Sequence, residues 1–223
     1  MNDIVWYLLC VPAALISLSV HEYSHGYAAY RLGDPTARSL GRLSLNPLKH
    51  LDPVGTVCMV FFRFGWAKPV PINPRYFKNP RRGMAITAAA GPLSNLFLAF
   101  LSAVFYKLSV LLGNTVLLQP SASQSTVLYY FFNYLCLFFL IFHTLNLSLF
   151  VFNMIPLPPL DGSRIFYVFL PNKWYFGIMK YERIIQIVLL IALALGAFTG
   201  VIQTVIHAIS NAMMSLLAFI PAQ

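Results

Sequence analysis

The sequence predicts an all-α polytopic membrane protein formed by one domain, residues 1–223. Hydrophobic residues make up 59% of the 223 residues and only 9% carry a formal charge, whereas soluble domains have about 45–50% apolar and about 25% charged residues. The apolar residues form long continuous runs instead of the alternating pattern of a membrane β-barrel. This composition excludes a soluble enzyme, a disordered chain and a secreted disulfide scaffold.

The few formal charges are mostly basic. Fifteen Lys and Arg residues against six acidic residues give a net charge of +9. Such a charge can attract nucleic acid, but in a membrane protein it is better explained by basic cytoplasmic loops, so no nucleic-acid partner is expected. The three cysteines, Cys10, Cys58 and Cys136, lie far apart in apolar segments. That placement is typical of buried thiols rather than of disulfides or metal ligands.

Four transmembrane helices account for the apolar segments, with five as the alternative. The first begins after a single charge, Asp3, whereas a cleaved signal peptide would begin with basic residues. The segments 83–106 and 108–160 contain no Asp, Glu, Lys or Arg and allow about 20 residues per span. The uncharged segment 184–223 is too long for one crossing, so it either ends as an interfacial helix or breaks near Gly196–Gly200 and returns. The predicted helices cover residues 4–30, 83–110, 127–156 and 184–206.

The distribution of basic residues predicts the orientation in the cell membrane. The loop at 31–82 contains ten of the fifteen Lys and Arg residues, the segment 161–183 contains four, and the connection at 113–126 contains none. Basic loops remain on the cytoplasmic side. We therefore expect both basic segments in the cytoplasm and the N-terminus outside, and four spans would indeed bring the two segments to one side.

The 31–82 loop contains structure of its own. Turn-forming pairs such as Asn46-Pro47 and Gly65-Trp66 flank a mostly apolar stretch at 56–64. This pattern predicts a small β or re-entrant region after the first helix. A packed surface loop without strands is equally compatible with it.

The sequence His21-Glu22-Tyr23-Ser24-His25 is an H-E-x-x-H motif at the end of the first apolar stretch. The spacing of four residues places both imidazoles on one helical face, so both can bind one metal ion. Glu22 can then face the open position of the ion and hold the attacking water. Carboxylates inside a membrane are costly and usually functional, which favours a metal centre over two histidines bonded to neighbouring helices.

Asp161 is the best candidate for a third ligand, since a catalytic zinc usually has three protein ligands and a water. It lies in a broken segment, residues 156–165, whose three prolines prevent a regular helix. Irregular backbone at membrane depth faces protein or a water-filled cavity, so the carboxylate can reach His21 and His25. The remaining acids lie in turns or at helix ends: Asp3, Asp34, Asp52 and Glu182.

Two further motifs accompany H-E-x-x-H. They are Gly91-Pro92-Leu-Ser-Asn95 in the second predicted helix and Asn153-x-x-Pro-x-Pro-x-Leu-Asp161-Gly162 after the third. Together the three motifs resemble the site-2 protease family of intramembrane zinc metalloproteases (peptidase family M50). The connection at 113–126 is too short for an inserted PDZ domain, so the resemblance is to the compact, core-only branch.

The resemblance implies a zinc endopeptidase that cuts transmembrane helices of other proteins inside the lipid bilayer, usually after another protease has shortened the substrate. It implies one Zn²⁺ per chain, held by His21, His25 and Asp161, with Glu22 as general base. A membrane peptidase whose third ligand is a downstream Glu is disfavoured, because the only later Glu, Glu182, lies in no motif. The remaining alternative is a catalytically inactive or non-proteolytic metal-binding membrane protein or transporter, and Glu22 argues against it.

Polar residues near the predicted site have two interpretations. The resemblance implies that Asn153 orients the substrate or stabilises the oxyanion, and an interhelical hydrogen bond explains it equally well. For His143 and Asn146 the interhelical bond is the preferred interpretation. Small residues allow close helix packing, and the residues expected to shape packing beside the site are Gly91, Pro92 and Asn95.

Overall fold

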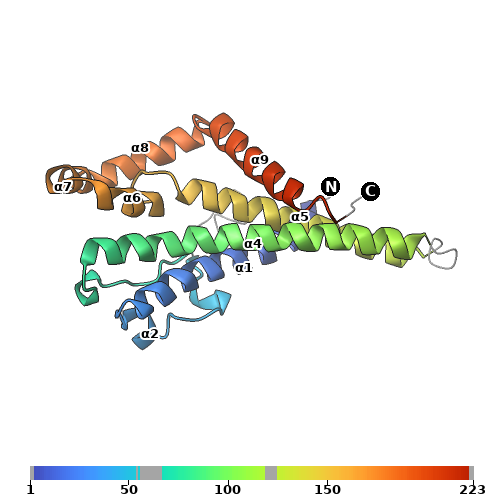
Figure 1. Ribbon diagram of the computed structural model, residues 1–223, viewed down its shortest axis with the longest axis horizontal. Helices are drawn as coiled ribbons and strands as arrows, with labels where there is room; N and C mark the ends of the chain where they lie inside the picture. Colours follow the sequence, from blue (N-terminus) through green and yellow to red (C-terminus); the bar gives the residue numbers. More distant parts are fainter. Residues whose placement is uncertain (1–2, 54, 56–66, 119–124, 221–223) are drawn as a thin grey trace.

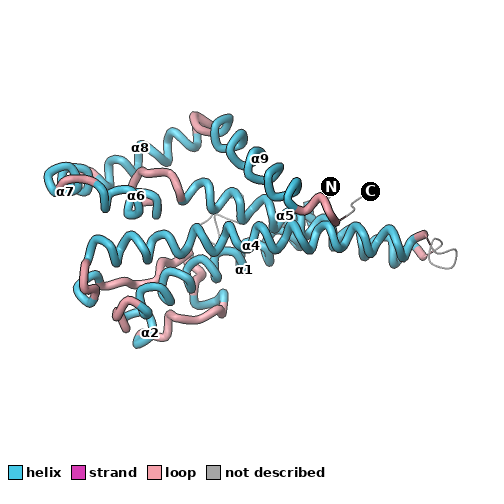
Figure 2. Tube along the Cα trace, in the orientation of Figure 1, coloured by secondary structure: helices cyan, strands magenta, loops and turns pink. Residues whose placement is uncertain are grey.

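The computed structural model describes residues 3–53, 55, 67–118 and 125–220, and its regular structure is helical (Figures 1 and 2). The long helices are α1 (Asp3–Arg31), α4 (Pro80–Leu117), α5 (Thr126–Asn153) and α9 (Thr199–Leu216). The short ones are α2 (Thr36–Ser39), η1 (Pro47–Lys49), η2 (Pro74–Tyr76), α6 (Asp161–Phe166), η3 (Tyr167–Phe169), α7 (Asn172–Lys180) and α8 (Glu182–Ala194).

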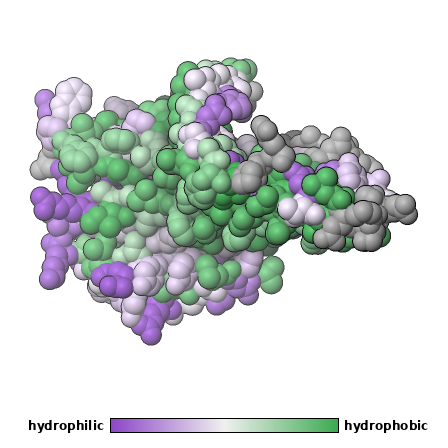
Figure 3. All heavy atoms as spheres, turned by 45° about the vertical axis from the view of Figure 1, so that its right-hand side comes forward, coloured by the Kyte–Doolittle hydropathy of each residue, from purple (hydrophilic) through white to green (hydrophobic). Residues whose placement is uncertain are grey.

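Three helices of the described chain are long and apolar enough to cross a membrane: α1, α4 and α5. This confirms the prediction of an all-α membrane protein at that level. Large apolar side chains such as Leu8, Phe97 and Phe131 are more than half exposed, as expected of a surface that faces lipid. Figure 3 shows this largely apolar surface over the body of the helices, with many hydrophilic atoms gathered toward one end.

Local sequence sets the boundaries of α4 and α5. The side chains of Asn79 and Ser125 accept hydrogen bonds from the first turns of these helices, which is the usual N-cap arrangement. Helix α4 continues to Leu117, beyond the predicted end at 110, because it still packs on α5 where Gly113 meets Phe132. Helix α5 ends at Asn153 rather than at 156.

Helix α4 runs antiparallel to both α1 and α5. Asn95 on α4 contacts His21 of α1 and Asn146 of α5, and farther along α4 Phe105 stacks on Phe139 with ring centroids 5.3 Å apart. As residue numbers increase along α4, the numbers of their contacts on α5 therefore decrease. The end of α1, the start of α4 and the end of α5 consequently lie at one end of the bundle (Figure 1).

The predicted single helix at 184–206 is wrong and the alternative break near Gly196–Gly200 is found instead, because the chain turns between α8 and α9. Gly196 adopts a positive φ of 75°, which glycine tolerates and which ends a helix. After this turn α9 packs against α5, so α8 and α9 meet at an angle (Figure 1). The buried cluster between α4, α5 and α9 consists of Ala99, Leu147, Val151, Ile206 and Met213.

The loop after α1 differs in part from the predicted β region. Within its described residues there is no strand, only one isolated bridge between Leu51 and Ala67. The predicted apolar stretch at 56–64 lies outside the described residues. After the bridge, the chain passes through an extended segment at 67–73 that is free of regular helix.

The predicted broken segment at 156–165 is shifted toward the N-terminus. The irregular part begins at Met154, directly after α5, and ends at Leu160, because helix α6 begins at Asp161. A Cβ on Gly162 would lie 2.4 Å from the carbonyl oxygen of Ile155. Only glycine at this position therefore lets α6 fold back onto the turn that ends α5.

Candidate metal centre

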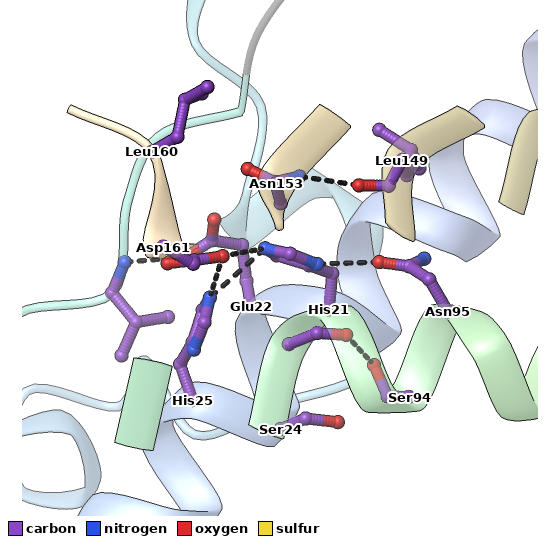
Figure 4. Close-up of polar contacts among 12 residues, drawn as sticks. His21, Glu22, Ser24, His25, Ser94, Asn95, Leu149, Asn153, Leu160 and Asp161 are labelled. Carbon is purple, nitrogen blue, oxygen red and sulfur yellow. Dashed lines mark hydrogen bonds and ion pairs between the residues drawn. The ribbon is translucent and has the colours of Figure 1, made fainter. Parts of the chain in front are cut away.

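His21 and His25 lie one turn apart on the buried face of α1. Their side chains point toward α4 and α6, and both residues are less than one-tenth exposed. The two Nε2 atoms are 3.0 Å apart. The i, i+4 spacing of the motif therefore produces the convergence expected of two ligands to one ion (Figure 4).

Asp161, 136 residues after His25 in the sequence, completes the group. The turn after α5 and the start of α6 place its Oδ2 3.2 Å from His21 Nε2 and 3.3 Å from His25 Nε2. These residues form the group of His, Cys, Asp and Glu side chains, among the described residues, whose ligand atoms come close enough to hold one metal ion. The structure thus brings together the three predicted ligands.

Hydrogen bonds on the far side of each imidazole define its tautomer. His21 Nδ1 lies 2.6 Å from Asn95 Oδ1 and His25 Nδ1 lies 2.7 Å from the carbonyl oxygen of Thr87. Both oxygens accept hydrogen bonds, so each neutral ring places its single N–H at Nδ1. Each Nε2 then presents a lone pair toward the other Nε2 and toward Asp161 Oδ2.

Three lone-pair donors that converge in this way suit a bound cation. Asp161 Oδ2 is buried and makes no hydrogen bond, and the neutral imidazoles offer it none. In tetrahedral coordination with Zn–N and Zn–O bonds of about 2.0–2.1 Å, neighbouring ligand atoms are about 3.3 Å apart. The observed separations of 3.0 to 3.3 Å match this value, so His21, His25 and Asp161 fit a zinc ion with an open fourth position.

Glu22 lies beside this group and is not part of it. Its Oε2 accepts a hydrogen bond of 2.8 Å from the backbone N–H of Val70, in the extended segment after the first loop. Glu22 lines the same cavity as the three candidate ligands. The carboxylate is therefore held at the wall of the cavity that the three candidate ligands line.

The glycine of the second motif makes room for the imidazoles. A Cβ on Gly91 would lie 2.4 Å from His25 Nε2 and 2.7 Å from His21 Cε1. One turn later, Asn95 accepts the hydrogen bond from His21. The motif therefore does more than the predicted shaping of helix packing, because Asn95 directly orients a candidate ligand.

The candidate ligands line a cavity of about 430 Å³. Asn153 lies on its wall at the end of α5, where its Nδ2 donates to the carbonyl oxygen of Leu149 at 3.0 Å (Figure 4). Its remaining N–H and its Oδ1 are left for other partners. The cavity is lined by residues of α1, α4, α5, α6, the turn between α5 and α6 and the 67–72 segment, among them Leu18, Met84, Ala88, Phe152, Pro159 and Arg164.

Two of the other acids, Asp34 and Glu182, have structural partners. Buried Asp34 accepts backbone N–H bonds from Thr36 and Asn73, as expected of a turn former. Glu182 pairs with Arg164 at 3.1 Å, which joins α8 to α6. Neither carboxylate reaches the histidines.

Two contacts of the centre were not expected from the sequence. The backbone groups of Thr87 and Val70 have no sequence signal, since any residue supplies a carbonyl and nearly any an N–H. The predicted interhelical bond of Asn146 is confirmed, since Asn146 Oδ1 accepts from Asn95 of α4, and its link to the centre is that the same Asn95 contacts His21. The sequence did give one indication of such a contact, because Asn146 is a polar residue within an otherwise apolar segment.

Comparison with known proteins agrees with this geometry. The chain is 46% identical over 155 residues to "Putative zinc metalloprotease YwhC" of Bacillus subtilis, across 70% of this chain and 66% of that protein. It is 31% identical over 162 residues to "Putative zinc metalloprotease Rip2" of Mycolicibacterium smegmatis and 27% identical to the protein of that name in Mycobacterium tuberculosis, in both cases across 55% of the relative. The matched region thus spans less than two thirds of these relatives.

No solved structure shows significant similarity to this chain. The sequence profile of peptidase family M50 matches residues 10–199, a range that contains the H-E-x-x-H helix, the Gly91-Pro92 motif and Asp161. The chain therefore belongs to peptidase family M50.

Proposed function

We propose that this chain is an intramembrane zinc metalloprotease that hydrolyses peptide bonds within or next to transmembrane segments of other proteins. The observation that carries the proposal is the convergence of His21 Nε2, His25 Nε2 and Asp161 Oδ2 beside the carboxylate of Glu22. A donor set of two neutral imidazoles and one carboxylate suits zinc. The zinc named in the relatives' descriptions supports the same choice of metal.

Each residue of the site has a separate task in this chemistry. A zinc ion bound by the three ligands supplies Lewis acidity that polarises the scissile carbonyl and activates water. Glu22 takes one proton from the water as the water oxygen bonds to the carbonyl carbon. As the carbon–nitrogen bond breaks, Glu22 returns that proton to the leaving nitrogen. The Val70 N–H keeps the second carboxylate oxygen of Glu22 in place.

Asn153 is the candidate donor to the oxyanion. It lies on the cavity wall, and its bond to Leu149 leaves one N–H of the amide available. A positioned donor of this kind stabilises negative charge as it develops on the carbonyl oxygen. Because the bond to Leu149 is within α5, the interhelical explanation gains no support from the described contacts.

A four-span topology with both basic segments in the cytoplasm agrees with the packing. Helices α1, α4 and α5 supply three crossings, and the bent pair α8–α9 supplies the fourth. Lys107, toward the far end of α4, donates to the carbonyl oxygens of Leu217 and Ile220, so the end of α9 lies far from the metal site. Apart from Lys107, the described basic residues end or follow α1, begin α4 or follow α5, which places them at the other end of the bundle.

The substrate class follows from the position of the site. The cavity lies between helices whose outer surfaces are apolar, so a substrate reaches it from the bilayer as a transmembrane helix. That helix must unwind locally before a carbonyl can reach the metal, because its backbone bonds are internal. Prior shortening by another protease, as the family resemblance implies, would ease its entry.

The test compares cleavage of a transmembrane reporter by the wild type and by Glu22→Gln, reconstituted in lipid vesicles. We expect Glu22→Gln to retain zinc but to cleave at least about a hundredfold more slowly, because the general base is lost. Asp161→Ala should lose zinc as well as activity. His207→Gln is the control, since His207 is exposed on α9 and should change neither.

Two results would contradict the proposal. Equal cleavage by the wild type and Glu22→Gln would exclude Glu22 as the base. A wild type that binds zinc but cleaves no transmembrane reporter would favour the inactive or transporter alternative.

A further inference from the structure

A chain of buried amides leads away from the metal centre through the bundle. His21 Nδ1 donates to Asn95 Oδ1 at 2.6 Å, and Asn95 Nδ2 donates to Asn146 Oδ1 at 2.9 Å. Asn146 Nδ2 in turn donates to the carbonyl oxygen of Phe142 at 2.8 Å. Both asparagines have no exposed surface. This series of hydrogen bonds therefore joins α1, α4 and α5 without contact with solvent.

The direction of every bond in this chain is determined by its last member. The carbonyl oxygen of Phe142 can only accept, so Asn146 must present its NH₂ group to it and its Oδ1 to Asn95. Asn95 must then present its own NH₂ group to Asn146, which leaves Oδ1 for His21. His21 consequently carries its proton at Nδ1 and its lone pair at Nε2, the form that binds a metal.

On the basis of the proposed function, we propose that Asn146 is a positioning residue of the metal centre. It keeps the Asn95 amide in the one orientation in which an oxygen faces His21. Without Asn146, the remaining restraint on the Asn95 NH₂ group is a long bond of 3.4 Å to the carbonyl oxygen of Ser17. Rotation of the amide would then place NH₂ against His21 Nδ1 and favour the tautomer whose Nε2 carries the proton.

His143 provides the comparison that separates this role from simple helix association. It lies one turn before Asn146 on α5 and is equally buried. Its ring contacts the carbonyl oxygen of Ala99 and the hydroxyl of Ser210, and neither group touches a candidate ligand. Loss of His143 should therefore weaken helix packing and leave metal affinity unchanged.

The experiment measures the zinc dissociation constant of the purified full chain by competition with a chromophoric chelator. We expect Asn146→Leu to raise the constant about tenfold or more, in the range found when groups that orient metal ligands are removed. His143→Leu should keep the wild-type constant. Asn146→Ala tests the same loss without added bulk, in case the leucine variant does not fold.

A second substitution distinguishes orientation from packing. Aspartate at position 95 has two equivalent oxygens, so it accepts from His21 in either rotation and needs no partner at 146. The double variant N95D/N146L should therefore regain a dissociation constant within about threefold of the wild type, as in carboxylate–histidine–zinc sites. A merely structural role for Asn146 predicts no such rescue.

The outcomes separate this inference from the proposed function. If the wild type binds no zinc, the proposed metalloprotease fails first. If the wild type binds zinc and the Asn146 variants bind it equally well, or the aspartate at 95 restores nothing, Asn146 does not position the centre. In that case the metal site itself remains supported.

Discussion

At the residue scale, the metal centre depends on a glycine, because its position has no room for a side chain. Gly91 faces both imidazoles, and a Cβ there would overlap His25 at 2.4 Å. Since the helix backbone of α4 cannot move away without breaking its packing on α1 and α5, the histidines would have to shift. Small residues of this kind are how membrane helices approach closely.

We therefore expect Gly91→Ala to weaken zinc binding by at least about tenfold, although alanine favours helix more than glycine does. Chelator competition on the purified chain measures it. Gly200→Ala is the matched control, because a Cβ at Gly200 meets nothing within 4 Å. Unchanged zinc affinity in Gly91→Ala would show that the imidazoles have more room than the structure describes.

At the element scale, the last helix is attached at its far end by one charged side chain. Lys107 interrupts the apolar sequence of α4, and its Nζ donates to Leu217 O at 2.7 Å and to Ile220 O at 3.4 Å. These carbonyls lie at the C-terminal end of α9, where a positive charge is favourable. The charge thus ties the end of α9 to α4, in addition to the apolar cluster that packs α9 on α5.

Lys107→Met should release the end of α9 and cost about 1 kcal/mol. The expected result is faster amide hydrogen exchange over the last two turns of α9, with exchange in α4 and α5 unchanged. Lys173→Met, at an exposed position of α7, is the control for loss of a positive charge. Identical exchange in wild type and Lys107→Met would mean that apolar packing alone holds α9.

At the scale of the whole molecule, metal binding should stabilise the fold, because the ligands come from two distant parts of the chain. Zinc at a hundred times its dissociation constant adds about 2.7 kcal/mol of stability. A thermal unfolding experiment in detergent should show a melting temperature several degrees higher with zinc than with chelator. His25→Ala should show no such difference, and an equal shift in that variant would place the zinc elsewhere.

The orientation in the membrane is a second property of the whole molecule. After replacement of Cys10, Cys58 and Cys136 by alanine, single cysteines at positions 75 and 126 should react with membrane-impermeant reagents from opposite sides. Position 75 is expected to be labelled from the cytoplasm, because it lies in the basic loop. If both cysteines react from the same side, α4 does not cross the membrane.

How far the sequence could predict this molecule depended on whether a feature is local. The H-E-x-x-H spacing defines a shared helical face whatever surrounds it, so His21 and His25 could be paired in advance. The turn at Gly196 could be offered only as one alternative, because glycine permits a positive φ without requiring it. The link between Asn95 and Asn146 was missed, since two asparagines 51 residues apart give no sign of which neighbours they meet.

The sequence by itself determined that this chain is a helical membrane protein, where α1, α4 and α5 lie and which residues could bind a metal. Those features depend on composition and short-range spacing, which act before distant parts of the chain meet. Only the tertiary structure decided that Asp161 reaches the histidines, that Thr87 and Asn95 set their tautomers and that Val70 holds Glu22. These contacts join residues 48 or more positions apart, and their geometry comes from the packing of α1, α4, α5 and α6 against one another.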